Sequence, residues 1–186
     1  MPLVPGARVL DAGGGTGTFS IPLAQALPHC TIIHLEPDRG MSETARKKAA
    51  WAGIGNFELL TADLFSSNFL PRSMSAIVSV HTLCAVAEPR AAIRMMADCL
   101  APGGGLFVCD PCRRRGWLAA LQIFWQGRRS ISESCRIARM QEAGRPWLHD
   151  SAEFRAEFER VGLEVEQAYK TYRGCRHVVV CRKPHV

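Results

Sequence analysis

Apolar and polar positions alternate along the chain in blocks that predict strands and helices in turn. Short apolar runs bounded by glycine, proline or polar residues predict buried strands. These runs lie at residues 7–13, 30–37, 56–63, 75–82 and 106–111. Segments with helical spacing of apolar residues lie between them, at 18–27, 41–53 and 89–100, and Pro22 is expected to kink the first. After a further helix at 150–162, two strands at 164–172 and 177–183 are predicted to form an antiparallel pair.

Strands that alternate with helices indicate a parallel sheet with both faces covered. The predicted fold is therefore α/β, a Rossmann-like, doubly wound and mostly parallel sheet that ends in an antiparallel strand. The 186 residues fit a single domain spanning 1–186. In such sheets ligands bind beyond the carboxyl ends of the strands, so the loops at that edge are the first place to look for a site.

The formal net charge of +6 is concentrated in one segment. Residues 112–145 carry two glutamates and eight arginines, at positions 113, 114, 115, 128, 129, 136, 139 and 145. This segment is either a solvated basic face or a region that attracts an acidic substrate, an acidic protein or nucleic acid.

The eight cysteines are spread along the chain, and only Cys109 and Cys112 have C-x-x-C spacing. A structural zinc site needs a second pair, so free thiols and no metal are expected. The longest apolar runs are shorter than a membrane helix requires, and the first residues do not resemble a secretion signal. We therefore expect a cytoplasmic protein without membrane contact.

Four glycines follow the first predicted strand, in Asp11-Ala-Gly13-Gly-Gly15-Thr-Gly17. Thr18 stands where a dinucleotide fingerprint requires its last glycine, which disfavours a nicotinamide-dependent oxidoreductase. The segment instead resembles the first motif of class I S-adenosylmethionine-dependent methyltransferases. The later stretch "SVHTLCAVAEP" is similar, at Leu83 and Val86, to the small-molecule, quinone-biosynthesis type of this family. That resemblance implies S-adenosyl-L-methionine as cofactor, released as S-adenosyl-L-homocysteine.

Three more motifs in the family's order extend the resemblance over residues 7–183. The stretch "EPDRGM" implies that Glu36 accepts the ribose hydroxyls and that Pro37 and Met41 contact the adenine; Met41 could equally be helix core. In "TADLF" the resemblance places Asp63 and Leu64 at the adenine, although Asp63 could instead cap a turn. "LAPGGGLFVCD" is similar to the family's turn before the fifth strand.

The glycine turn and the end of the fourth strand supply the other candidate positions. Glycines let the backbone approach a ligand, and a following helix N-terminus favours its carboxylate. Asp11 is expected to hold the turn or to meet the methionine ammonium, and Ser79 to lie near the cofactor. Since methyl transfer depends mainly on alignment of the reactants, a dedicated catalytic residue is not required.

The methyl acceptor is less clearly indicated. Nucleic-acid methyltransferases of this class carry an Asn/Asp-Pro-Pro-aromatic motif after the fourth strand, where this chain has "SVHTLCAV", so a nucleic-acid substrate is disfavoured. His81 in that stretch is a candidate general base, and the alternative is a structural histidine. Residues 112–149, an insertion after the fifth strand, are expected to form the acceptor side, with arginines suited to an anionic small molecule.

About seven residues precede the first strand, whereas the family usually has helices there. We therefore expect an open site, or one covered by a homodimer or a partner chain. The predicted function is methyl transfer to an O, N or C atom of a small molecule. The alternatives are a non-catalytic or partner-dependent S-adenosylmethionine-binding subunit and, less favoured, an RNA methyltransferase or an oxidoreductase.

Overall fold

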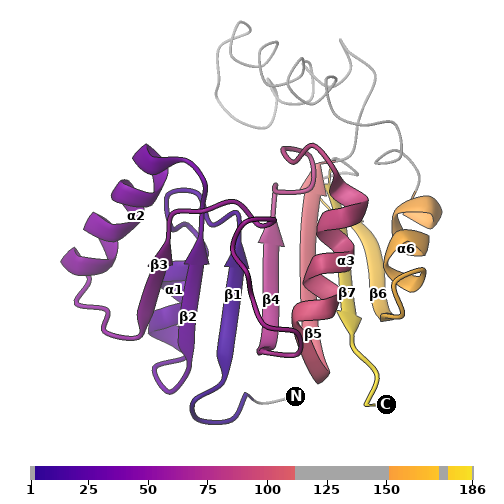
Figure 1. Ribbon diagram of the computed structural model, residues 1–186, viewed down its shortest axis with the longest axis horizontal. Helices are drawn as coiled ribbons and strands as arrows, with labels where there is room; N and C mark the ends of the chain where they lie inside the picture. The colour runs from indigo at the N-terminus through magenta and orange to yellow at the C-terminus, as the bar shows by residue number, and fades with distance from the viewer. Residues whose placement is uncertain (1–2, 112–150, 172–175, 186) are drawn as a thin grey trace, which may run out of the picture.

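The computed structural model describes residues 3–111, 151–171 and 176–185, and within them one seven-stranded sheet (Figure 1). The strand order is β3-β2-β1-β4-β5-β7-β6. The strands are β1 Arg8–Ala12, β2 Thr31–Leu35, β3 Phe57–Leu60, β4 Met74–Val80, β5 Leu100–Pro111, β6 Glu164–Thr171 and β7 Arg176–Arg182. The first five pair in parallel, and β7 runs antiparallel to both β5 and β6. The predicted fold class is confirmed.

Helices cover the two faces of this sheet. They are α1 Ser20–Ala26, α2 Arg39–Trp51, α3 Pro89–Cys99 and α6 Ser151–Glu159. Ala24 of α1 packs with Val9 and Ile32, whereas α3 and α6 pack with Leu10 and Ile33, the next residues along the same strands. Because neighbouring residues of a strand point to opposite faces, α1 lies on one face and α3 and α6 on the other.

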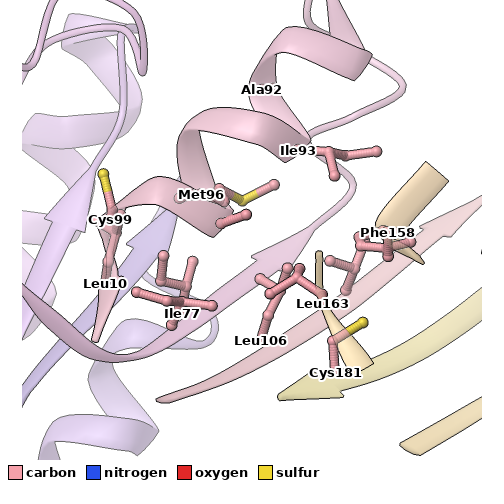
Figure 2. Packing of buried hydrophobic residues seen from close by; sticks show 14 of the residues in the cluster. Leu10, Ile77, Ala92, Ile93, Met96, Cys99, Leu106, Phe158, Leu163 and Cys181 are labelled. Atoms are coloured by element: carbon pink, nitrogen blue, oxygen red, sulfur yellow. The ribbon is translucent and has the colours of Figure 1, made fainter. Parts of the chain in front are cut away.

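The larger core cluster holds α3 and α6 against the sheet (Figure 2). Met96 of α3 and Phe158 of α6 are fully buried beside Ile77 of β4 and Leu106 of β5. Each such side chain contributes about 1.5–3 kcal/mol by leaving water. This packing fixes the direction of β4 and β5, and with it the position of the loops at their carboxyl ends.

Two local predictions were wrong. Helix α1 begins at Ser20, so Pro22 lies in its first turn, where a backbone N–H has no intrahelical acceptor and proline is tolerated. Strand β5 begins at Leu100 and includes the glycine-rich stretch that was expected to be a turn. The register shifts between Met74–Leu100 and Ala76–Gly105, so that stretch forms an irregularity within the strand.

The part of the chain that the structure describes contains no helix long and apolar enough to span a membrane. The predicted acceptor-side segment, 112–149, and its arginines lie outside the described residues.

Candidate functional site

A cavity of about 620 Å³ opens at the carboxyl ends of β1, β2 and β4. Its wall includes seven of the ten predicted cofactor residues together with the predicted base. Those eight residues are Gly13, Gly15, Glu36, Pro37, Met41, Asp63, Leu64 and His81. The remaining lining residues are Leu35, Asp38, Phe65, Val80, Thr82, Ala85, Val86 and Ala87. Loops that are distant in sequence therefore meet where the doubly wound topology predicts a ligand.

The glycine turn is tied to β2 and β4 by its backbone. The N–H groups of Gly13 and Gly14 both donate to the Leu35 carbonyl, at 2.8 and 2.9 Å. Thr82, whose hydroxyl donates to the Ala12 carbonyl at 2.7 Å, lies where a Cβ on Gly13 would be. Gly13 also has φ +75°, a conformation that side chains disfavour. The turn thus presents bare backbone to the cavity.

Glu36 joins the turn to the end of β2. Its Oε2 accepts the Gly15 N–H and its Oε1 accepts the Asp38 N–H, both at 2.9 Å, and the side chain is buried. A carboxylate has about four acceptor positions, so both oxygens keep acceptor capacity. Glu36 is consequently fixed in place at the cavity wall and still able to accept two hydroxyl groups.

Two aspartates organise the loops beside Glu36. Asp38 caps helix α2 by accepting the Met41 N–H at 2.7 Å. Asp63 accepts the N–H groups of Phe65 and Ser66, at 2.7 and 2.9 Å, and the Ser66 hydroxyl. The hydrogen bonds from Ser66 hold the pKa of Asp63 below its ordinary value. Asp63 therefore caps a turn and also lines the cavity.

Three predicted cofactor residues do not line the cavity. Ser79 is fully buried and its hydroxyl has no partner among the described residues. Gly17 packs against Ile21 and Ala45, which fill the space a Cβ would need. Asp11 lies buried behind the turn, where it accepts a hydrogen bond from Ser20. The three residues lie beside or behind the glycine turn and the end of β4, so their roles toward a cofactor stay predictions.

His81 follows β4 with φ +60° and its side chain lines the cavity. Its N–H donates to the Cys109 carbonyl at 2.9 Å, which anchors the loop to β5. Burial and the charge of Arg176 lower the pKa of the His81 imidazole. The ring is therefore neutral near pH 7, the form in which it can accept a proton.

Asp110 holds the same loop from beneath, a role that the sequence analysis did not predict. Its Oδ1 accepts the Cys84 N–H at 2.9 Å, and its Oδ2 has no partner among the described residues. Burial raises the pKa of this carboxyl group to about 6. The sequence analysis also did not predict the contact of Thr82 with the glycine turn or the capping of helix α2 by Asp38. For Asp110 the available signal was an acid near the end of a buried strand, in "FVCDP".

Other potential sites are less developed. A second cavity, of about 410 Å³, is lined by Gly103, Gly104 and Gly105 of β5 and contains none of the predicted site residues. Within the described ranges, no group of three or more His, Cys, Asp or Glu residues is arranged to hold a metal ion.

The sheet order, the glycine turn and the acid that ends β2 together define the class I methyltransferase version of the Rossmann-like fold. A family model described as a methyltransferase domain matches residues 2–168, and the chain belongs to this family. The methyl donor of the family is S-adenosylmethionine.

Two curated relatives are about one-third identical to the chain. The aklanonic acid methyltransferase DauC of Streptomyces sp. (strain C5) is 31% identical over 114 residues, which cover 61% of this chain and 52% of the relative. A demethylmenaquinone methyltransferase of Clavibacter sepedonicus is 32% identical over 120 residues, covering 61% and 47%. The match thus spans about half the length of these relatives.

Three solved structures share the fold at lower identity. The [4+2]-cyclase SpnF has a TM-score of 0.75 and 16% identity, over 98% of this chain and 76% of that one. A methyltransferase from Aquifex aeolicus has a TM-score of 0.71 and 16% identity, over 97% and 84%. A methyltransferase in complex with the Haloferax volcanii activator Trm112 has a TM-score of 0.71 and 19% identity, over 100% and 86%.

Proposed function

We propose that this chain is a methyltransferase that moves a methyl group from S-adenosylmethionine to an O, N or C atom of a small molecule. The observation that carries the proposal is the placement of Glu36. Its carboxylate is fixed by the Gly15 and Asp38 N–H groups at the wall of a cavity that also contains Asp63 and Leu64. An acceptor of two hydroxyl groups next to a bare backbone turn suits a nucleoside with an amino-acid tail.

The charge of the cavity also suits this cofactor. Three carboxylates line it, from Glu36, Asp38 and Asp63, while the described part of the wall contains no lysine or arginine. The cofactor supplies an electrophilic methyl group on a positively charged sulfur. A negatively charged wall favours that charged form over the neutral sulfur of the product.

The chain's own residues would then orient the ligand. In this proposal Glu36 holds the ribose, the backbone at Gly13 and Gly15 faces the amino-acid end, and Pro37, Met41, Asp63 and Leu64 surround the adenine. His81, neutral near pH 7, would accept the proton that an O–H or N–H acceptor loses on methylation, while the bound cofactor would supply the methyl group.

Apart from its carboxylates and His81, the cavity wall is mostly apolar. Phe65, Val80, Ala85 and Val86 are among the residues that line the cavity with His81. This lining suits an aromatic or otherwise largely apolar small molecule. The names of two relatives point the same way, towards aklanonic acid and demethylmenaquinone. An anionic group on the acceptor would be served by the arginines between 113 and 145, which lie outside the described residues.

Calorimetric titration with S-adenosylmethionine and S-adenosylhomocysteine tests the proposal. We expect wild-type binding of both, tighter for the first, and at least about tenfold weaker binding by Glu36→Gln, which removes the charged hydrogen-bond acceptor. Glu43→Gln, on the exposed face of α2, is the matched control. Absence of binding by a folded wild-type protein, or unchanged binding by Glu36→Gln, would contradict the proposal.

The second candidate is a subunit that binds the cofactor and requires a partner. Two solved structures with this fold support the alternative. One is a [4+2]-cyclase, so the fold is not confined to methyl transfer, and the other is a methyltransferase bound to an activator protein. Cofactor binding without turnover of demethylated quinone or polyketide acceptors, restored by a co-purifying protein, would support this reading. Turnover by the isolated chain would exclude it.

A further inference from the structure

Behind the glycine turn lies a chain of three buried polar side chains that the proposed function does not use. Asp11 of β1, Ser20 of α1 and His34 of β2 come from the three elements that border the turn. Asp11 and His34 are register partners across β1 and β2, and all three side chains are buried. The Ser20 hydroxyl donates to Asp11 Oδ2, and its oxygen lies 2.7 Å from His34 Nδ1.

His34 forms the floor of the turn. A Cβ placed on Gly14 would overlap its Nδ1 and Cε1 atoms, so the imidazole lies directly against the Gly14 backbone. Gly13 and Gly15, on either side of Gly14, line the cavity. Any shift of the ring is therefore transmitted to the backbone that would meet the cofactor's amino-acid end, because close-packed groups move together.

The three groups share a limited number of protons. A serine hydroxyl donates once, and here it donates to Asp11. At His34 the Ser20 oxygen can then only accept, so the Nδ1 proton of His34 is the donor, and Nε2 is left without a partner among the described residues. In this form the chain carries one negative charge.

One added proton neutralises that charge and reverses the hydrogen bonds. Burial raises the pKa of Asp11 to about 6 and lowers the pKa of His34, so Asp11 is the group that takes the proton. Its new O–H then donates to Ser20, the Ser20 hydroxyl donates to His34 Nδ1, and the ring proton moves to Nε2. The His34 ring is neutral in both forms, and the change alters which of its nitrogens carries the proton, in the ring that lies against the Gly14 backbone.

The surrounding charges are few. Glu36, at the end of β2, is the carboxylate that acts on both Asp11 and His34. Helix α1 contains no charged residue, and Phe57 of β3 contacts the His34 ring. Ser79 of β4 is uncharged, and Lys48 of α2 is bonded to the outer side of the turn through Thr16.

We propose that Ser20 and His34 are positioning residues of the cofactor site, and that the Asp11–Ser20–His34 chain couples its own proton to the conformation of the Gly13–Gly15 turn. The charged form of the chain binds the cationic cofactor more tightly. The effect on cofactor affinity rests on the proposed function, because that function names the ligand. The coupling of the proton to the turn does not, since it exists in the free protein.

The first measurement needs no ligand. Amide ¹H–¹⁵N shifts of Gly13, Gly14 and Gly15 are recorded in the free protein from about pH 5 to about pH 7.5. We expect them to move together with a midpoint near 6, and to stop moving in Asp11→Asn. In Ser20→Ala the midpoint rises, because the hydrogen bond that lowers the pKa of Asp11 is gone. Shifts that do not titrate, or that titrate unchanged in Asp11→Asn, overturn the inference.

The second measurement is the affinity for S-adenosylmethionine over the same range. We expect wild-type binding to weaken by about fivefold between the two ends as the negative charge is lost, and Asp11→Asn to lose most of this pH dependence, with Asp110 and His81 still titrating beside the cavity. His177→Gln, a buried histidine on β7, is the matched control and keeps the wild-type profile. Wild-type affinity that does not change with pH overturns the coupling, whereas no binding at any pH contradicts the proposed function and leaves the shift experiment to decide the inference.

Discussion

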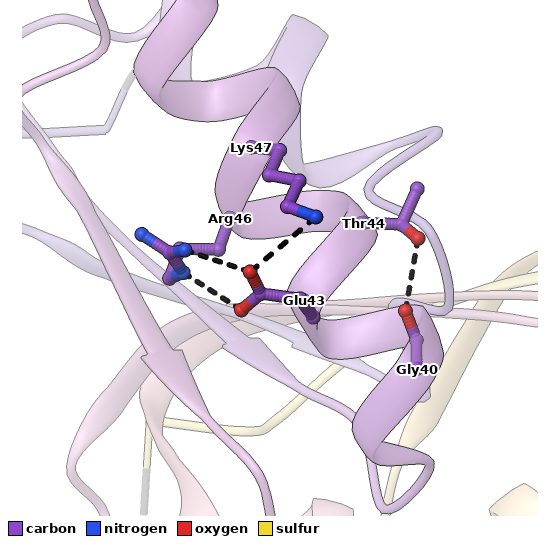
Figure 3. A network of polar contacts seen from close by, with 5 residues as sticks. All are labelled: Gly40, Glu43, Thr44, Arg46 and Lys47. Carbon is purple, nitrogen blue, oxygen red and sulfur yellow. Dashed lines mark hydrogen bonds and ion pairs between the residues drawn. The ribbon is translucent and has the colours of Figure 1, made fainter.

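Two polar networks in this molecule use similar groups in opposite surroundings. On the outer face of α2, Glu43 pairs with Arg46 at 2.7 Å and with Lys47 at 3.8 Å, and Thr44 bonds the Gly40 carbonyl (Figure 3). Behind the glycine turn, Asp11, Ser20 and His34 are buried. Hydrogen bonding to Arg46 lowers the pKa of Glu43 to about 2, whereas burial raises that of Asp11 to about 6.

The comparison of the exposed and the buried network indicates which polar groups affect stability and the cofactor site. An ion pair exposed to solvent adds little net stability, because its two groups give up hydrogen bonds with water to form it. Dissolved salt also screens their attraction. A buried carboxylate without a full charge partner is costly, so its protonation alters both stability and local geometry. The network beside the turn should therefore respond strongly to substitution and pH, and the α2 network weakly.

The largest effect is expected from Gly14→Ala. The new methyl group would overlap the His34 ring, and overpacking of this kind costs about 2–3 kcal/mol in free energy of unfolding. S-adenosylmethionine affinity should fall as the turn is displaced. Urea unfolding and calorimetry measure the two effects.

Gly15→Ala is the control for that substitution. A Cβ on Gly15 would meet no atom within 4 Å beyond its chain neighbours, and the residue has φ +57°, so only about 1 kcal/mol of backbone strain is expected. Gly15 lines the cavity, so the control applies to stability, and equal losses of unfolding free energy in the two variants would show that the His34 contact has no special role.

The second effect concerns pH. The folded pKa of Asp11, about 6, lies above the unfolded value of 3.8, so the native state binds the extra proton between them. Stability from this group is highest below about pH 4 and falls by about 2–3 kcal/mol as the pH rises through 6. Asp11→Asn lacks this titration, so its free energy of unfolding relative to wild type should rise by the same amount as the pH increases from about 4 to above 6. Urea unfolding at several pH values measures this difference. A stability difference that is constant with pH would contradict the assignment.

A third and smaller effect is expected at Lys48. Its Nζ donates to the Thr16 carbonyl at 3.0 Å, an exposed link to the same turn. Lys48→Met should weaken S-adenosylmethionine binding by no more than about threefold, since exposed polar contacts are worth about 1 kcal/mol or less. A loss of affinity as large as that of Gly14→Ala would remove the distinction between the buried and the exposed link.

The smallest effect is expected from Glu43→Gln. Because Glu43 is solvent-exposed, we expect no resolvable change in the unfolding midpoint or in cofactor binding. Any residual difference should vanish at about 1 M salt, where the Debye length is about 3 Å. A difference that persists in high salt would mean that the α2 network contributes more than surface ion pairs normally do.

Much of the fold and of the cavity could be predicted from the sequence. Strand and helix periods are local properties, so the alternation that leads to β1, α1, β2 and α2 is visible in the residues themselves. The glycine turn and Glu36 were equally visible, because each occupies a fixed place relative to a strand end. By contrast, β5 was predicted six residues too short, since its first part is a strand only through pairing with β4 and β7.

Which face a polar residue occupies was decided by the tertiary structure. Asp11 was expected either to hold the turn or to meet the methionine ammonium, and the register of β1 against β2 places it beside Ser20 and His34 behind the turn. Asp110 reaches the loop of His81 only because β5 lies beside β4. By itself the sequence determined the order of elements, the turn that needs glycine and the acid that ends β2, since these follow from short-range chemistry. Only the packed sheet decided which of its buried acids face the cavity and which share a proton beneath it, because burial and proximity across strands are properties of the folded chain.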